Sequence, residues 1–347
     1  MAVRLKDIAR DLGVSVVTVS KVLRGNADIG DETRKRVLKR MKELNYQPNM
    51  MARGLASGLT YTVGLIVPDL VHPFFAEFAR SLSVVLRTSN RALILASSEE
   101  DPKIEQQEIQ TLLRRGVDVL IIASCQANLR NFYELGDNRT PYILFDRNFA
   151  HLAAHFVGSD DVLVGEMATN HLIELGRKRI AHIGSCNSST SFDRLRGYRN
   201  ALVAAGLPSP NEMVVSRKRV EEEGDRIGFQ VMRELLSLKS KPDAVFCYND
   251  LTAIGAIEAT LRAGLRVPED IAFVGCGNFR YSNFLRVPLS SIDQGTAELG
   301  RVAGGFALEL VTNPQQEPRS LLVPPTLVAR ESTLGSKSGK KRHSRQK

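Results

Sequence analysis

The 347-residue chain contains no tryptophan, and aromatic residues make up only 6% of it. Its four cysteines are widely separated and form no Cys-x-x-Cys pair, which argues against a disulfide framework and a cysteine-bound metal. We expect them to be buried free thiols in a reducing compartment. The sequence also lacks an apolar run of about 18 residues and a secretory leader. These absences predict a cytoplasmic chain without membrane contact, disulfides or bound metal.

The sequence signatures of common enzyme classes are missing as well. No P-loop, Gly-x-Ser-x-Gly elbow or His-Glu-x-x-His helix occurs. Gly275–Gly277 is followed by no helix with a third glycine, so it is not a dinucleotide fingerprint. His151 and His155 are four residues apart, but the irregular sequence around them favours a surface loop over a metal pair. We predict that the chain is not an enzyme and needs no cofactor. An enzyme and a binding protein without a regulatory role are the alternatives.

Positive charge is concentrated at the two ends of the chain. The formal net charge is +9; residues 1–60 hold 12 Lys and Arg against 6 Asp and Glu, and residues 336–347 hold 6 Lys and Arg and no acid. The middle of the chain is therefore mildly acidic, and the basic ends suit the phosphates of a nucleic acid. The tail has no apolar residues, so we expect it to be disordered. It either adds non-specific DNA affinity or is simply solvated.

The first 47 residues have the periodicity of a helix-turn-helix. Apolar residues at helical spacing predict helices at about 6–12, from residue 16, and at about 31–44. Gly13 can end the first helix in a left-handed conformation, and Ser15 can cap the second. A small three-helix unit that contacts another protein is the alternative to DNA binding.

The outer face of the second predicted helix has an unusual composition for a surface. Val16 and Val17 lie on its first turn, where they gain nothing from water but can contact thymine methyl groups in a major groove. Lys21 lies one turn later and can reach a guanine or a phosphate, and Asn26 suits a phosphate. DNA contacts are therefore predicted at Val16, Val17, Ser20, Lys21 and Asn26.

From residue 61 onward, short apolar runs alternate with helical stretches. Buried strands are predicted at 63–67, 92–96, 117–123 and 142–145. The intervening helices are expected at 74–88, 102–115 and 127–136. A second series of strands follows at 156–158, 180–183, 213–215, 244–247 and 271–274. Such alternation predicts doubly wound parallel sheets, and two series predict two lobes.

Polar residues follow several of these strands. Ligands of open α/β sheets bind beyond the carboxyl ends of the strands, and two facing lobes form a cleft there. Ligand binding is therefore predicted for the polar residues at these ends, with one phenylalanine as an apolar wall: Phe75, Asp146, Arg147, Arg194, Asn249 and Asp250. Helix caps or lobe-stabilising polar contacts are the alternative for each.

The head resembles that of the LacI/GalR family of bacterial transcriptional regulators. The matching motifs are Lys6–Ala9, Val14–Ser15, Thr18–Leu23, Glu32–Arg34 and Leu44–Asn49. The resemblance implies that the helix from Val16 is the recognition helix, and that a hinge helix follows, orders on DNA and pairs in the minor groove.

The same resemblance places Arg53, Leu55 and Ala56 in that hinge helix, with Leu55 as a wedge between base pairs. Gly54 would soften such a helix, because glycine costs about 1 kcal/mol relative to alanine in a helix. A flexible linker is the alternative.

Residues 61–333 resemble the periplasmic-binding-protein-like core of the same family. The motifs include His72–Phe75, Phe145–Arg147, Arg194–Tyr198, Asn249–Ala256 and Leu289–Gln294. The resemblance implies that Asp146, Arg194, Asn249 and Gln294 contact a small effector. We therefore expect a homodimeric transcriptional regulator that acts as a repressor and binds a pseudo-palindromic DNA operator. A small polar effector, such as a sugar or sugar derivative, is expected to control it allosterically.

Two segments depart from the family pattern. Gly275–Asn278 lacks the acid that often follows this strand, and Glu221–Gly224 is acidic where some members place a stacking aromatic residue. A neutral hexose stacked on an aromatic ring is therefore disfavoured. A sugar acid, a phosphorylated sugar, another small polar molecule and weak dependence on any effector all stay open.

Together these patterns predict an α/β protein with a three-helix helix-turn-helix head at 1–47, a hinge helix or linker at 48–60 and a two-lobed, periplasmic-binding-protein-like core at 61–333. Lobe one is expected at about 61–157 and 289–320, and lobe two at about 158–288 and 321–333. Residues 334–347 are expected to form a disordered basic tail.

Overall fold

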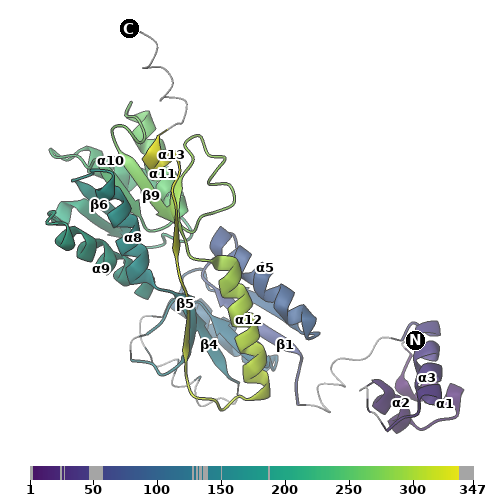
Figure 1. Cartoon of the computed structure of the whole chain (residues 1–347). Coiled ribbons are helices and arrows are strands. Elements are labelled where there is room, and N and C mark those ends of the chain that lie inside the picture. Colours follow the sequence, from purple (N-terminus) through teal and green to yellow (C-terminus); the bar gives the residue numbers. More distant parts are fainter. Residues whose placement is uncertain are drawn as a thin grey trace, which may run out of the picture. The chain divides into compact units, whose positions relative to one another are not determined.

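The computed structural model describes residues 3–23, 26, 28–46, 58–126, 129, 132, 135, 140–149, 151–186 and 188–335. The chain divides into two compact units, residues 1–60 and residues 61–347 (Figure 1). The predicted hinge residues Arg53, Leu55 and Ala56, most of the predicted 127–136 helix and the basic tail from residue 336 lie outside the described residues.

The N-terminal unit contains the helices α1 (Leu5–Leu12), α2 (Val16–Leu23) and α3 (Asp31–Glu43). Gly13 ends α1 with a φ of 64°, a conformation that glycine adopts without a Cβ clash. The Ser15 hydroxyl accepts a hydrogen bond from the Thr18 amide at 3.0 Å and so caps the start of α2. Apolar residues from each of these helices form a small core, which consists of Ile8, Ala9, Val19, Val22, Val37 and Met41. The predicted three-helix head is confirmed.

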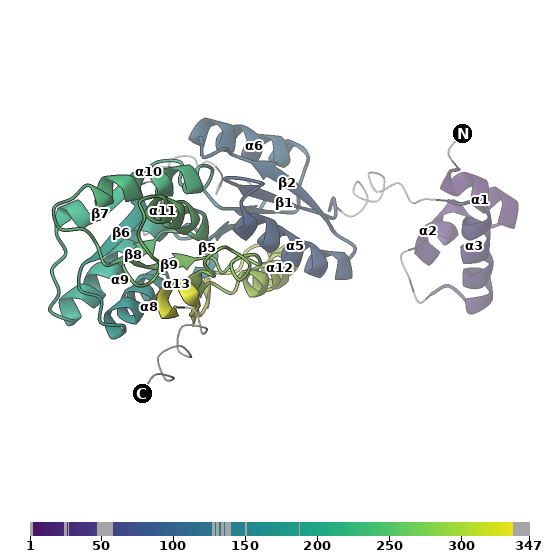
Figure 2. The ribbon, with the colours of Figure 1, turned by 90° about the horizontal axis from the view of Figure 1, so that it is seen from above.

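The first lobe of the larger unit is built on a parallel sheet. Its strands are β1 (Thr62–Val67), β2 (Ala92–Ser97), β3 (Val119–Ile122), β4 (Tyr142–Phe145), β5 (His155–Ser159) and β11 (Ser320–Val323), in the spatial order β11-β5-β4-β3-β1-β2. The helices α5 (Pro73–Thr88) and α12 (Thr296–Thr312) pack side by side against one face, and α6 (Pro102–Arg114) covers the other (Figure 2). Because both faces are covered, β1 and β3 are almost entirely apolar and buried.

The second lobe has a similar sheet, except that its edge strand runs antiparallel to its neighbour. Its strands are β6 (Ile180–Ser185), β7 (Val214–Arg217), β8 (Ala244–Cys247), β9 (Ala272–Cys276), β10 (Ser290–Asp293) and β12 (Thr326–Val328), in the order β12-β10-β9-β8-β6-β7. The helices α8 (Asp161–Glu174) and α9 (Ser189–Ala204) cover one face, and α10 (Gly224–Leu236) and α11 (Asp250–Arg262) cover the other. A 3-10 turn (Asn211–Met213) precedes β7, and α13 (Glu331–Leu334) follows β12. The predicted doubly wound, two-lobed α/β core is confirmed.

The structure corrects the predicted lobe boundaries near the C-terminus. The chain crosses between the lobes after β5, after β10 and again between β11 and β12. Strand β10 was expected in lobe one, but it pairs with β9 of lobe two, where Ile292 is buried. Strand β11 was expected largely in lobe two, but it pairs with β5 of lobe one. Pro324 and Pro325, which lack the amide hydrogen that a ladder needs, separate β11 from β12.

No helix within the described part of the chain is both long enough and apolar enough to cross a membrane.

Candidate functional site: the interlobe cleft and the DNA-binding head

A small polar cavity lies between the two lobes, at the carboxyl ends of their strands. The lining residues come from both lobes: His72, Phe74, Asp146, Arg194, Glu221, Tyr248, Asn249, Cys276, Gly277, Phe279 and Gln294. The cavity volume is only about 10 Å³, which is room for roughly one water molecule. The cleft is therefore closed in this structure, and the lobes must part before a sugar-sized molecule can enter.

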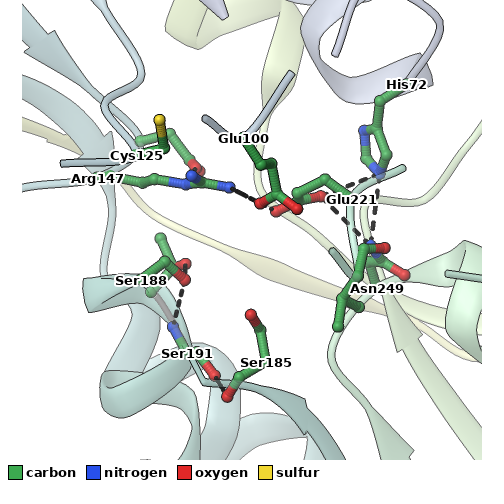
Figure 3. Close-up of polar contacts among 12 residues, drawn as sticks. His72, Glu100, Cys125, Arg147, Ser185, Ser188, Ser191, Glu221 and Asn249 are labelled. Carbon is green, nitrogen blue, oxygen red and sulfur yellow. Dashed lines mark hydrogen bonds and ion pairs between the residues drawn. The ribbon is translucent and has the colours of Figure 1, made fainter. Parts of the chain in front are cut away.

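The carboxylate of Glu221 lies at the centre of the polar contacts in the cleft (Figure 3). Its Oε1 lies 3.2 Å from Nη2 of Arg147 and accepts a hydrogen bond from the Tyr248 hydroxyl at 2.9 Å. Its Oε2 lies 3.3 Å from Nε2 of His72 and 3.4 Å from Nδ2 of Asn249. One buried acid thus holds four polar side chains.

The lobe-one side of the cleft has spare hydrogen-bonding capacity. Arg147 donates to Glu100 at 3.2 Å as well as to Glu221. Within the described residues, Nε of Arg147, Nδ1 of His72 and Oε2 of Glu100 are buried without a hydrogen-bond partner. Buried polar atoms of this kind are costly unless something satisfies them. Of the three residues, only His72 lines the cavity.

The second guanidinium of the cleft belongs to Arg194 on α9. It donates to Asp161 at 2.8 Å and to the Tyr248 carbonyl at 2.7 Å, and it lies 4.7 Å from the centre of the Tyr248 ring. This placement depends on the close crossing of α8 and α9. A Cβ on Gly197 would lie 2.0 Å from the Val162 carbonyl oxygen, so only glycine permits this approach.

Burial raises the pKa of every acid in the cleft, and the partners of each acid decide the direction of the net shift. Burial and the nearby Asp161 raise the pKa of Asp146 to about 7, and burial raises the pKa of Asp161 to about 6. Burial alone would raise the pKa of Glu221 too, but His72, Arg147 and the other partners outweigh it and hold that pKa below its usual value. Burial lowers the pKa of His72, although the neighbouring Glu221 carboxylate opposes this shift.

The head presents the predicted reading face to solvent. The Val16 and Val17 side chains are 45% and 61% exposed, whereas Val19 and Val22 of the same helix are buried. Lys21 forms an exposed ion pair with Asp28, with Nζ and Oδ2 2.5 Å apart. Two apolar side chains open to water on the first turn of a helix agree with a surface that a DNA groove would cover.

Comparisons with known proteins decide the family. Residues 4–49 match "Bacterial regulatory proteins, lacI family", and residues 169–333 match "Periplasmic binding protein-like domain". The ribose operon repressor of Haemophilus influenzae is 36% identical over 335 residues, which cover 96% of this chain and 99% of that protein. The chain belongs to the LacI family. It is a transcriptional repressor of that family, as its family resemblance predicted.

Solved structures of transcriptional regulators show the same architecture. The complex of the transcriptional regulator CelR with cellobiose is 30% identical, with a TM-score of 0.71, and covers 95% of this chain and 99% of that one. A LacI-family regulator from Enterococcus faecium with bound ribose is 28% identical, with a TM-score of 0.70, and covers 80% of this chain and 100% of that one.

The interlobe cleft contains most of the predicted effector residues. Asp146, Arg194, Asn249 and Gln294 line the cavity, and Arg147 reaches it through Glu221. Asn249 has a second role, because its Oδ1 caps α11 by accepting from the Thr252 amide at 2.9 Å.

Besides Arg147, two more of the predicted residues do not line the cavity. Phe75 packs in the core of lobe one, and its neighbour Phe74 lines the cavity instead. Asp250 is buried under the segment after β9, where it accepts hydrogen bonds from the Phe279 amide and from the hydroxyls of Ser282 and Ser291 at 3.0, 3.0 and 2.6 Å. It therefore fastens this segment to the start of α11.

His72, Tyr248 and Glu221 were not predicted as site residues. His72 begins the motif His72–Phe75, and Tyr248 lies between the predicted 244–247 strand and the motif Asn249–Ala256, so both positions were a usable signal. Glu221 was noted only as a departure from the family pattern. Its loop between β7 and α10 has no periodicity that would place it in the cleft.

Proposed function

We propose that this LacI-family repressor acts as a homodimer on a pseudo-palindromic operator, and that a neutral, polyhydroxylated molecule of about pentose size controls it by binding between the lobes. The observation that carries the proposal is the cleft, where buried polar atoms from both lobes converge and some lack partners. A ligand that satisfies groups of both lobes stabilises one interlobe geometry over another, which is the basis of allosteric control.

The charge of the cleft favours a neutral ligand. The carboxyl groups of Glu100, Asp146, Asp161 and Glu221 surround the guanidiniums of Arg147 and Arg194, so each guanidinium already has an anionic partner. A sugar acid or sugar phosphate would add negative charge to this site. The ribose operon repressor relative and the ribose-bound structure support a pentose.

DNA reading is proposed for Val16, Val17 and Lys21, with support from Ser20 and Asn26. The exposed valines support base contacts, and Lys21 must exchange its Asp28 partner for DNA. The hinge role of Arg53, Leu55 and Ala56 stays a prediction from the family resemblance.

An exposed apolar surface supports the homodimer. Val71 before α5 and Phe284 after β9 are 85% and 84% exposed, and Leu70, Val84 and Tyr281 are exposed as well. The two segments are neighbours, because the ring centres of His72 and Phe279 lie 5.4 Å apart. Exposed apolar side chains that gather on two neighbouring segments favour an interaction site, and we propose that a second copy of the chain covers them.

The dimer is tested by sedimentation of the Phe284→Asp variant. We expect monomers and weak operator binding, because a charge would be buried at the interface. Phe192→Asp is the matched control, since Phe192 is also exposed, at 61%, but lies on α9 outside this surface. A Phe284→Asp variant that stays dimeric would contradict the assigned surface.

The function is tested by selecting genomic DNA fragments with the purified protein at near-physiological salt. We expect a pseudo-palindrome, whose complex responds to a neutral pentose but not to the matching sugar acid or phosphate. Binding that is salt-sensitive and indifferent to sequence would contradict the proposal. Release by the acid or phosphate alone would contradict the ligand class.

A further inference from the structure

The Glu221 carboxylate belongs to one lobe, and two of its partners belong to the other. Glu221 lies in the loop between β7 and α10 of lobe two. Arg147 follows β4 and His72 precedes α5, so both belong to lobe one. The contacts of 3.2 and 3.3 Å therefore cross the cleft (Figure 3).

The neighbouring acids of the same loop behave differently. Glu222 and Glu223 pair with Arg219 and Arg226, which lie within four residues of them in lobe two. Glu221 is turned away from these arginines and is buried, with 5% of its surface exposed. Glu221 therefore contacts the opposite lobe through Arg147 and His72, and its own lobe through Tyr248 and Asn249.

In the closed cleft, polar side chains replace the water that the Glu221 carboxylate loses on burial. Burial of an ion pair is favourable only when further hydrogen bonds complete the pair. Here the Tyr248 hydroxyl and the Asn249 amide supply them. The pKa of Glu221 stays below its usual value and that of Arg147 lies above its usual value in spite of burial, so the ionised pair is favoured inside the closed cleft.

We propose that Glu221 is a tethered internal ligand: its carboxylate occupies the place of a ligand's acid group, holds Arg147 and His72 of the opposite lobe, and closes the cleft without an effector. This inference rests on the proposed function only in identifying the cleft as the effector site. We call the contacts of Glu221 with Arg147 and His72 the latch. The inference predicts that a neutral effector binds by adding to or rearranging the latch. It also predicts that an anionic ligand is excluded while Glu221 is present.

The experiment is amide hydrogen exchange on the full-length protein without DNA or effector, with sodium acetate as the probe. We expect Glu221→Ala to speed exchange at the cleft segments around His72 and Arg147 by about tenfold or more, because both side chains lose their ionic contact with the opposite lobe. Acetate at 100 mM should then restore slow exchange by replacing the missing carboxylate. Glu222→Ala is the matched control and should show neither effect.

Two outcomes would overturn the latch. Cleft exchange in Glu221→Ala that equals the wild type would show that the lobes close without this side chain. Faster exchange that acetate does not slow, in a variant whose strands β6 and β8 stay protected, would show a packing defect and not a missing anion. If Glu221→Ala does not fold, Glu221→Gln keeps the shape, and it should open the cleft while the β6 and β8 amides stay protected. Neither readout involves an operator, so failure of the DNA-binding proposal would be seen separately.

Discussion

Removing the Asp250 carboxylate should unfold the second lobe more easily and leave the cleft chemistry intact. In Asp250→Ala, the Phe279 amide and two serine hydroxyls lose their buried acceptor. A hydroxyl can turn to another partner, but the amide cannot, and each unsatisfied buried group costs about 1–3 kcal/mol. We expect a loss of about 3 kcal/mol in the free energy of unfolding and a fall in Tm of about 6–10 °C for a unit of this size.

Asp250→Asn is the matched variant for this prediction. Its amide oxygen can still accept from the Phe279 amide, while its NH₂ group faces Ser291, whose hydroxyl can reverse and accept. We expect less than half the loss seen for Asp250→Ala. Thermal unfolding of all three proteins and effector titration of operator complexes supply the two readouts. A variant with unchanged Tm and abolished effector response would refute the structural role and restore Asp250 as a ligand contact.

Three further predictions concern the head, the hinge and the second lobe. Val16→Thr with Val17→Gln should change the base preference found by DNA selection without lowering Tm, because both side chains are exposed; an unchanged preference would exclude them as base contacts. Leu55→Ala should weaken specific binding and DNA bending while non-specific affinity persists, and unchanged bending in a circular-permutation gel would exclude the wedge. Burial lowers the pKa of His182 to about 4, although the Phe246 carbonyl opposes the shift. The unfolded chain therefore binds the extra proton, and stability should fall by about 3 kcal/mol as pH drops from about 6.5 to about 4. His182→Asn should remove this part of the pH dependence of Tm, and an equal dependence in both proteins would assign it elsewhere.

Helical periodicity and strand alternation were sufficient to predict the architecture. In the head, the burial of Val19 and Val22 and the exposure of Val16 and Val17 follow from the position of each residue on one amphipathic helix. The location of the cleft followed from the rule that ligands lie beyond the carboxyl ends of parallel strands. Both inferences depend on local sequence, and both needed no knowledge of which segments meet in space.

The errors lie where long-range pairing or side-chain rotation decides the answer. Strand β10 has the same local pattern whichever lobe it joins, and only its pairing with β9 assigns it. Phe74 and Phe75 are both buried at the start of α5, and a rotation of about 100° per residue separates the one that faces the cavity from the one in the core. At Asn249 and Asp250, capping geometry turned the first side chain toward the cleft and the second into the lobe.

Glu221 departs from the family pattern, and its contacts give this departure a role that the sequence alone did not indicate. In the sequence, an acidic segment in place of a stacking aromatic residue disfavoured a neutral hexose stacked on an aromatic ring. In the structure, the same carboxylate bridges the lobes through Arg147 and His72 and is the best-connected acid of the cavity. An aromatic residue at this position could only cover a ligand, because it offers no charge to Arg147. Glu221 instead forms an ion pair with Arg147 across the cleft. An effector must therefore supply less free energy to close the lobes. Effector specificity in this chain should therefore depend on Arg147 and Glu221 together. The effect of substituting both residues on the effector response should differ from the sum of the effects of the two single substitutions.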